Sequence, residues 1–528
     1  MKKYLFLAVA ALGLAACAEK GLDNNGPANK GELEQSYVAI TLAASDMNTK
    51  AGTDPDGVYA VGTTEERAVK SAYVFFFKDG KAFPVAFDGT TSTSTYGGPI
   101  NYLPVTLTDN GQDMNNVSDV KDAVLILQNY QGQYPNQIVA VLNWTPAADK
   151  LYDLSDIQKE ITTLRGYNNG FVMSNAVYAD NAAETVDATD LTIANIAKTA
   201  DDAKANPVTI HVERVAAKVV FSSEDSGKFE VGEVDGKKIY AQIKGFQLYN
   251  DYQTSWLIKR ITPTWNDLGF NWNDPSWFRS YWATSLDTAF PANTFQWDGG
   301  YTELGSFVYC GENTRTWTNE NDVRTKVIVK ATLVDETGTV RQEVVNWYGK
   351  DYLNEGKLLN VVANTLKNTY FSGNGTTFTG LAPEDIKCVG RAMTDENAYE
   401  VYFQLSDAGE AKTWYKYTDN QYGEIAIATL NTELAAVQPA LVYNDGMTYY
   451  YTDIKHLGAP KSTAEYGVVR NHVYKVNITD IEGFGTPVYD PTSDFIVPDK
   501  PEEIVTYVAA QINILSWRVV ANDYQLGE

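Results

Sequence analysis

The stretch SYVAITLAAS (residues 36–45) decides how the N-terminal part of this chain is expected to fold. Apolar side chains stand at every second position, and between them lie Tyr37, Ala39 and Thr41. The apolar set is Val38, Ile40, Leu42 and Ala44. Alternation with a period of two is typical of a β-strand with one buried face. The charged, Gly- and Pro-containing stretch DMNTKAGTDPDG (46–57) that follows predicts an exposed loop.

Further strand patterns follow along the chain, with turn signals between them. Two strands flank Asp79-Gly80 and predict a hairpin, and VTIHVERVAAKVVF (208–221) predicts one long strand or two broken by a bulge. Other predicted strands lie at 122–128, 137–144, 238–251, 325–348, 396–406, 411–418, 447–454 and 471–481. This succession predicts a mostly β fold of two β-sandwich-like domains.

Helix patterns are few. LSDIQKEITTLRGY (154–167) has apolar residues on one helical face, Ser155 as a cap and Gly166 at its end, so it predicts the main helix. ATLNTELAAV (428–437) predicts a shorter one. We therefore expect β-sandwiches that carry only a few short helices.

Length and charge limit the kinds of partner. The chain has 528 residues, enough for two domains of ordinary size, and 44% of them are hydrophobic. Its formal net charge is −25, spread along the sequence rather than gathered in a tail. Such a surface repels phosphate backbones, so we expect no nucleic-acid partner.

The N-terminus carries an export signal. Lys2 and Lys3 precede a short apolar run, and LAAC ends the segment at Cys17. This end resembles a bacterial lipobox, which implies cleavage before Cys17 and acylation of that residue. An ordinary signal peptide with a chance cysteine is the alternative. No other segment approaches the roughly 18 apolar residues of a membrane span, so lipid would be the only membrane attachment.

Motifs of known catalytic and metal sites are absent from the sequence. It contains no P-loop, GxSxG or HExxH pattern, and its three histidines have no metal-ligand spacing. TDPDG (53–57) lacks the distal Glu of a calcium loop. A pair of carboxylates in a cleft stays open, as does pairing of Cys310 with Cys388. We expect no enzyme, no cofactor and no bound metal.

A Trp-rich stretch, TPTWNDLGFNWNDPSWFRSYWATS (262–285), predicts a long loop. Its rings are Trp265, Trp272, Trp277, Phe278, Tyr281 and Trp282. Exposed rings of this kind stack on sugars, whereas a loop that folds back buries them. Burial is the interpretation that we favour.

The C-terminus combines a linker with a strand. PVYDPTSDFIVPDKPEE is rich in Pro and Asp, and YVAAQINILSWRVVANDYQLGE (507–528) begins with a strand pattern. A lone strand buries nothing, so it must pair with its own domain or with another molecule. Its largest apolar side chains are Ile512, Ile514, Leu515, Trp517 and Val519. Their burial would contribute about 10 kcal/mol as an upper estimate.

Several of these stretches together resemble the fimbrillins of Bacteroidales, the subunits of type V pili. The lipobox with strand 36–45 comes first, and AGTDPDGVYAVGTTEERAVKSAYVFFF (51–77) looks like the mature start of short-fimbria (Mfa-type) shaft subunits. Family segments recur at 170–179, 208–221, 307–314 and 468–485, and the linker with its final strand closes the match. The order and spacing of these segments carry the resemblance.

The resemblance implies a route of assembly. Family precursors are exported, lipidated and carried to the outer membrane, where a trypsin-like protease cuts behind the first strand. Loss of that strand opens a groove that a strand of a neighbouring subunit fills, and residues 505–528 are the expected donor. The chain would thus join a head-to-tail homopolymer with anchor and tip subunits and support adhesion and biofilm formation.

The expected cut is Lys50-Ala51, where the best-known members have Arg, and Arg67-Ala68 is the alternative. The expected segments are a signal peptide (1–16), a propeptide (17–50), two β-sandwich domains (51–230 and 231–485), a linker (486–504) and the donor strand (505–528). A pilus anchor or accessory subunit stays open. So does a monomeric surface lipoprotein that binds glycans through the Trp-rich loop and keeps its last strand at home.

Overall fold

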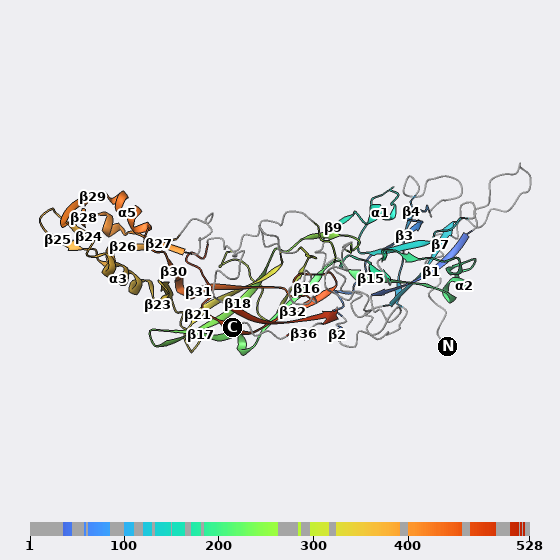
Figure 1. Cartoon of the computed structure of the whole chain (residues 1–528). Coiled ribbons are helices and arrows are strands. Elements are labelled where there is room, and N and C mark those ends of the chain that lie inside the picture. The colour runs from blue at the N-terminus through green and yellow to red at the C-terminus, as the bar shows by residue number, and fades with distance from the viewer. Residues whose placement is uncertain are drawn as a thin grey trace, which may run out of the picture. The chain divides into compact units, whose positions relative to one another are not determined.

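The computed structural model divides the chain into two compact units (Figure 1). Unit 1 comprises residues 1–216, 253–286 and 469–471, and unit 2 comprises 217–252, 287–468 and 472–528. The structure describes residues 35–44, 58–59, 62–84, 100–109, 120–128, 133–148, 150–163, 170–180, 184–261, 283–286, 296–315, 324–390, 400–456, 465–492, 507–516, 518–519 and 521–522. In these residues strands greatly outnumber helices, which confirms the predicted mostly β fold.

The main sheet of unit 1 contains the strand predicted at 36–45, here β1 (Gln35–Ala44). The strand order is β4-β3-β8-β10-β15-β1-β7-β6, so β1 is an interior strand. The bounds are β4 (Lys81–Ala82), β3 (Ala72–Lys78), β8 (Gln137–Leu142), β10 (Met173–Asn175), β15 (Val208–Arg214), β7 (Val120–Gln128) and β6 (Thr108–Asp109). Three short strands pair with strands of this sheet, namely β5 (Tyr102–Pro104) with β3, β13 (Thr189–Asp190) with β8 and β14 (Ile196–Ala197) with β1.

The predicted hairpin at Asp79-Gly80 is confirmed. It joins β3 to β4, and both turn residues have positive φ angles of 52° and 74°. Such angles suit the tight turn that matches the twist of two paired strands. One end of the unit 1 core is aromatic: the buried ring of Phe75 meets Tyr152 edge-on at 5.5 Å between ring centroids.

The main predicted helix is wrong beyond its first turn. Helix α1 spans only Leu154–Ile157, its N-cap is Asp153 rather than Ser155, and the chain continues as β9 (Ile161–Thr163). β9 pairs with β19 (Thr254–Trp256), a strand far away in the sequence. The β-branched run of Ile161 and its two following threonines favours a strand, and this pairing prevails over the helical periodicity.

Unit 2 is built on two sheets. One has β20 (Phe307–Cys310), β16 (Ala217–Ser223), β32 (His472–Glu482) and β34 (Tyr507–Ser516) in that order, and β36 (Ala521–Asn522) also pairs with β34. The other has β17 (Lys228–Val234), β18 (Lys237–Tyr249), β21 (Lys326–Val334), β31 (Met447–Asp453) and β33 (Thr486–Pro487). Phe221 of β16 stacks on Phe246 of β18 with 4.7 Å between ring centroids, so the sheets face each other as in a sandwich.

Unit 2 also carries a lobe, residues 344–443, inserted between β21 and β31 (left in Figure 1). Its first sheet is β23-β22-β30-β27-β26, with bounds Lys350–Leu353, Val344–Trp347, Ala440–Tyr443, Glu400–Leu405 and Ile386–Gly390. Its second is β25-β24-β28-β29, with bounds Phe378–Gly380, Tyr370–Gly373, Trp414–Thr418 and Gln421–Ile425. Helices α3 (Glu355–Leu366), α4 (Asp407–Glu410) and α5 (Ile427–Ala435) complete it, and a separate hydrophobic core holds it together.

The units differ in extent from the predicted domains. The predicted boundary between residues 230 and 231 falls inside β17, because the polar stretch around it forms a β17–β18 hairpin rather than a linker. The sequence 208–221 forms two strands, β15 and β16, which belong to different units. The start of the predicted linker also belongs to the fold, since Thr486 and Val488 are buried beside β31.

Short elements account for the remaining regular structure. They are β2 (Val58–Tyr59), β11 (Tyr178–Asp180), β12 (Glu184–Val186), α2 (Ala200–Ala205), β35 (Arg518–Val519) and the 3-10 turns at 193–195, 225–227, 383–385 and 444–446. Among the described residues, no helix is long and apolar enough to cross a membrane.

Candidate functional site

Strand β1 is paired along both of its edges. It runs antiparallel to β7 from Gln35 to Ala43 and parallel to β15 from Ile40 to Ala44. Near its start, Tyr37 and Val38 also pair with β14. The backbone groups of β1 therefore complete two neighbouring strands, and loss of β1 would leave an open edge on each of them.

The middle of β1 is buried on both faces. Val38 and Ile40 on one face are fully buried, and Ala39 on the other face is 3% exposed. The Thr41 hydroxyl donates a 2.9 Å hydrogen bond to the Asp122 carboxylate on β7. Leu42 and Ala44 continue the strand, but their side chains lie outside the described residues. Each large apolar side chain buried in this way contributes about 1.5–3 kcal/mol.

The predicted processing residues divide into two groups. Cys17, Lys50 and Ala51 lie outside the described residues. Arg67 and Ala68 are described, and they close a hydrogen-bonded turn in which the Arg67 amide donates to the Thr63 carbonyl at 3.1 Å.

Side chains from elsewhere in unit 1 hold this turn on both sides of the Arg67-Ala68 bond. Arg214 Nε donates to the Glu66 carbonyl at 2.8 Å, and Asn143 Nδ2 donates to the Ala68 carbonyl at 2.8 Å. The carbonyls before and after Arg67 are thus both bonded. A protease that needs an extended substrate would have to break these contacts first.

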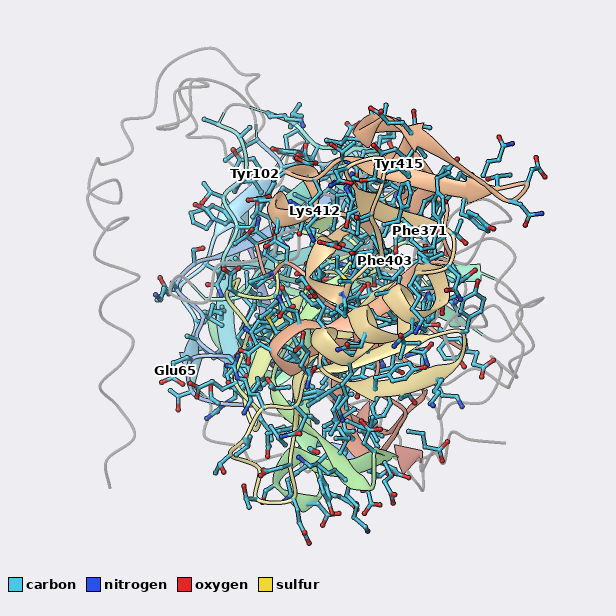
Figure 2. All side chains as sticks on the ribbon, turned by 90° about the vertical axis from the view of Figure 1, so that its left-hand side faces the viewer. Glu65, Tyr102, Phe371, Phe403, Lys412 and Tyr415 are labelled. Carbon is cyan, nitrogen blue, oxygen red and sulfur yellow. The ribbon has the colours of Figure 1, made fainter. Side chains whose placement is uncertain are left out.

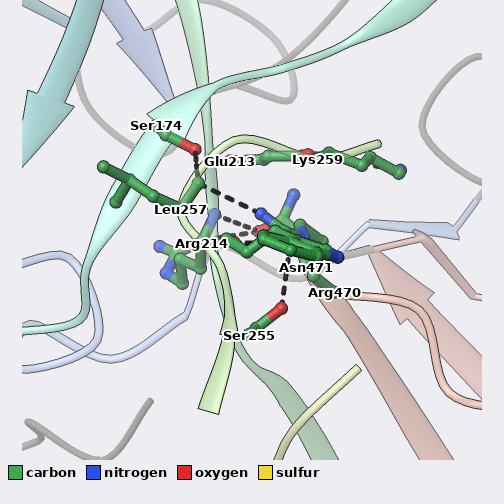
Figure 3. Close-up of polar contacts among 9 residues, drawn as sticks. Ser174, Glu213, Arg214, Ser255, Leu257, Lys259, Arg470 and Asn471 are labelled. Carbon is green, nitrogen blue, oxygen red and sulfur yellow. Dashed lines mark hydrogen bonds and ion pairs between the residues drawn. The ribbon is translucent and has the colours of Figure 1, made fainter. Parts of the chain in front are cut away.

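The same part of unit 1 contains a buried polar group that we call the arginine clasp, formed by Arg214, Arg470 and Asn471 (Figure 3). Arg470 is fully buried, and its guanidinium donates to the Trp256 carbonyl at 2.8 Å and the Ser255 hydroxyl at 2.9 Å. Asn471 Oδ1 accepts from Arg214 Nη1 at 3.3 Å. The clasp ties residues 470–471 to two other segments of unit 1.

Buried charges surround the clasp. Lys259 and Glu213 form an ion pair at 3.8 Å, and both side chains are almost fully buried. Ser174 donates to the Leu257 carbonyl at 2.7 Å, and the same carbonyl accepts a bond from Arg470 at 3.3 Å (Figure 3). These contacts hold separate segments of unit 1 together.

The C-terminal strand β34 is paired within unit 2. It runs antiparallel to β32, with Ile512 opposite Val476, Ile514 opposite Tyr474 and Leu515 opposite Val473. The side chains of β34 and residue Trp517 lie outside the described residues, and Val519 belongs to β35. The candidate donor strand therefore sits at home in this uncut chain.

The residue immediately before β32 belongs to the clasp. Asn471 donates from its backbone to the Ala216 carbonyl at 2.7 Å, and the chain then enters β32 at His472. The strand on which β34 rests is thus tied covalently to a buried anchor in unit 1. Sequence reasoning missed this anchor, although Arg470 lies in the segment 468–485 that carried the family resemblance.

The other predicted sites are the Cys310–Cys388 pair, the Trp-rich loop and the stretch 53–57. Cys310 lies buried on β20, while Cys388 packs in the separate core of the lobe. The Trp-rich rings and the stretch 53–57 lie outside the described residues. Within the described ranges, no group of His, Cys, Asp or Glu has the arrangement of a metal site.

Comparisons with known proteins identify the C-terminal region. Residues 441–523 match the family model for the major fimbrial subunit protein type IV, fimbrillin, C-terminal. This range runs from β30 through the paired strands β32 and β34. No curated protein matches the chain.

A solved structure is also similar, that of a proposed cell adhesion protein from Parabacteroides distasonis. The two chains are 12% identical with a TM-score of 0.36, and the match covers 91% of this chain and 96% of the other. Through residues 441–523, the chain is thus similar to the C-terminal part of fimbrillins, the major subunit proteins of bacterial fimbriae.

Proposed function

We propose that this chain is a fimbrillin, that it is the shaft subunit of a short-fimbria (Mfa-type) pilus, and that it polymerises by protease-triggered donor-strand exchange. The observation that carries the proposal is the position of β1. It lies inside the main sheet of unit 1, buried at Val38 and Ile40, yet it is the first strand in the described part of the chain. A terminal strand can be removed by a single cut.

Loss of β1 would create the acceptor groove. The edges of β7 and β15 would expose unpaired backbone groups, and the apolar side chains that covered Val38 and Ile40 would face water. A strand from another copy satisfies both edges when it lies parallel to β15 and antiparallel to β7. This contact joins different surfaces of two copies, so it does not close and grows a filament.

Strand β34 is the proposed donor. It has ten residues, the same length as β1, and it stands near the other end of the chain. To donate, it must leave both β32 and β36, so exchange replaces these pairings by pairing with the edges of β7 and β15. While β1 fills the groove, β34 has no acceptor, which accounts for its position at home in the uncut chain.

Lys50-Ala51 is the proposed cut. The alternative bond, Arg67-Ala68, is held by Arg214 and Asn143, and these contacts count against cleavage there in the folded chain. We also propose acylation of Cys17 on the precursor, transport to the outer membrane and release of the lipid by the cut. The proposal assigns the chain no catalysis and no cofactor.

The experiment is an intact-mass and gel analysis of surface material from the native bacterium, run without boiling. We expect a ladder of oligomers that collapses on boiling into protein lacking residues 1–50. A ladder built of protein that begins at Ala68 would support polymerisation and place the cleavage at Arg67-Ala68 instead of Lys50-Ala51. A single monomer with lipid on Cys17 would overturn the proposal.

One observation favours a second candidate, a monomeric surface lipoprotein. Its last strand would remain in its own unit, as β34 does here. Glycan binding through the Trp-rich loop would be its function, and the lipidated monomer above is the result that supports it.

A further inference from the structure

The outer face of a sheet in the lobe of unit 2 presents five aromatic rings. The sheet is β25-β24-β28-β29, and its ladder places Tyr370, Trp414 and Ile425 toward the lobe core. Residues that alternate with these point to the opposite face. They include the rings of Phe371, Phe378, Tyr415, Tyr417 and Tyr422, which we call the aromatic face. Figure 2 looks onto this lobe and labels Phe371 and Tyr415.

The rings of the aromatic face form one connected patch that is not buried. Tyr422 stacks on Phe378 at 3.8 Å between centroids and meets Phe371 edge-on at 5.0 Å. Tyr417 lies 4.8 Å from Tyr422. Tyr417 and Tyr422 are 37% and 42% exposed. A contiguous exposed patch of large rings is rare on a soluble domain and generally marks a binding surface.

The charged side chains at this face are acidic. Glu424 lies two residues from Tyr422 on the same side of β29, and Asp419 lies at the adjoining turn. Both are exposed, and within the described residues neither carboxylate has a hydrogen bond or an ion pair.

Elsewhere in the chain, the protein places its own cations over aromatic rings. Lys218 lies 3.9 Å from the Phe307 ring, and Lys330 lies 4.1 Å from the Trp297 ring. In the part of the chain that the structure describes, none of the five rings of the aromatic face has a Lys or Arg over it. The nearest lysine along β28, Lys416, points inward and pairs with Glu433 at 2.7 Å.

We propose that the aromatic face binds a polypeptide segment of a partner through its exposed Arg or Lys side chains. Ring faces attract cations, and unpaired carboxylates beside them add a directed charge–charge attraction. The net charge of −25 brings a basic partner toward the chain. An uncharged sugar would use the rings but gain nothing from Glu424 as a charge. This site is separate from β1 and β34, so it goes beyond the proposed polymerisation.

The test uses the full-length chain and a 12-residue peptide of alternating Arg and Gly. A second peptide with citrulline in place of Arg keeps the shape and removes the charge. Tyr422→Thr removes a ring from the face, and its matched control is Phe307→Thr, an aromatic residue 39% exposed on β20 whose ring Lys218 already covers. Glu424→Gln is paired with Glu384→Gln, which changes the same charge on an exposed residue of the same lobe.

We expect the Arg peptide to bind and the citrulline peptide not to bind. Tyr422→Thr should weaken binding about tenfold and Glu424→Gln about threefold, while both controls stay within about twofold. In NMR spectra, the Arg side-chain methylene protons should shift upfield on binding, because they lie over ring faces, and Tyr422→Thr should abolish that shift. Thermal unfolding followed by circular dichroism checks that each variant stays folded.

Three results would overturn the proposal. One is the absence of Arg-peptide binding. Another is equal weakening by Glu384→Gln or Phe307→Thr, which would reduce the binding to general attraction by an acidic protein. The third is a glycan array on which the unchanged chain binds neutral oligosaccharides and the Tyr422→Thr variant does not, while that variant binds the Arg peptide as well as the unchanged chain does. This result would assign the face to sugars.

Discussion

β1 and β34 are strands of equal length near opposite ends of the chain, and the protein holds them differently. β1 fills an interior position of its sheet, between an antiparallel and a parallel neighbour. β34 lies along β32, which begins at His472, directly after the clasp residue Asn471 in the sequence. The uncut chain thus keeps both strands at home, and only removal of β1 opens a vacant position. Under the proposed exchange, the state of β1 therefore decides whether β34 has an acceptor.

The largest expected effect comes from a charge placed in the middle of β1. Ile40→Asp buries a carboxylate without a partner, so we expect unit 1 of the uncut chain to lose about 3–5 kcal/mol of unfolding free energy. Urea denaturation followed by circular dichroism measures this. Thr209→Asp, at an exposed position on neighbouring β15, is the matched control. Equal losses from both variants would contradict the interior position of β1.

The anchor ahead of β32 should give the next largest effect. Arg470→Met removes the donors to the Trp256 carbonyl and the Ser255 hydroxyl, and we expect a loss of about 2 kcal/mol. Hydrogen exchange at residues 253–258 should speed up. Arg341→Met, at a half-exposed ion pair with Asp445, should leave these amides unchanged. Slow exchange in both variants would mean that the clasp does not hold this segment.

A third variant separates the two candidate cuts. Asn143→Gly removes the side-chain bonds to the Ala68 and Phe171 carbonyls, so we expect trypsin to cut after Arg67 about tenfold faster. Mass spectrometry of the fragment that starts at Ala68 measures the rate. Asn136→Gly, which removes bonds to Asp79, is the control. Rapid cutting at Arg67 in the unchanged chain would restore this bond as a cleavage site.

The smallest effect lies in the lobe, which contains neither strand. Burial raises the pKa of the Glu355 carboxyl, although hydrogen bonds with Cys388 oppose the rise. A raised pKa in the folded state means that the folded lobe binds the proton more tightly than the unfolded chain does. The ionised carboxyl therefore lowers the free energy of unfolding once the pH rises above the pKa of Glu355 in the unfolded chain. Glu355→Gln should therefore raise the melting temperature at pH 7.

The same variant should have no effect near pH 3, where Glu355 is protonated in both states. Calorimetry at the two pH values measures the difference, with Glu384→Gln as the exposed control. A gain that persists undiminished at low pH would contradict the assigned cause. A gain in the unfolding of unit 1 would mean that the lobe is coupled to β1.

Alternation and turn residues predicted much of the fold. Local patterns predicted β1, the Asp79-Gly80 hairpin and helix α5. Each of these elements carries its periodicity of apolar residues, or its turn residues, within its own short stretch of sequence. The helix predicted from residue 154 ended early because β9 pairs with β19, a contact that no local window contains. Helix α3 was missed, although Asn354 caps it with a bond from the Lys357 amide.

Less of the candidate site could be predicted from the sequence. Val38 and Ile40 were predicted to be buried, but the burial of Ala39 on the other face follows only from the sheet order. Arg470 is distant in sequence from the residues that it bonds, and a lone arginine before a strand carries no local signal. The aromatic face was missed for the same reason, since its rings come from four strands that the ladder brings together.

The most direct test mixes two forms of the chain. The acceptor lacks residues 505–528 and has been cut by the protease, which is then inhibited, and the donor is the uncut full-length chain. We predict a 1:1 complex that survives electrophoresis without boiling, whereas neither form assembles alone. The same truncated chain left uncut is the control, because it keeps β1 and offers only the edge of β32. No complex with the cut acceptor, or an equal complex with the uncut one, would contradict donor-strand exchange into the groove of β1.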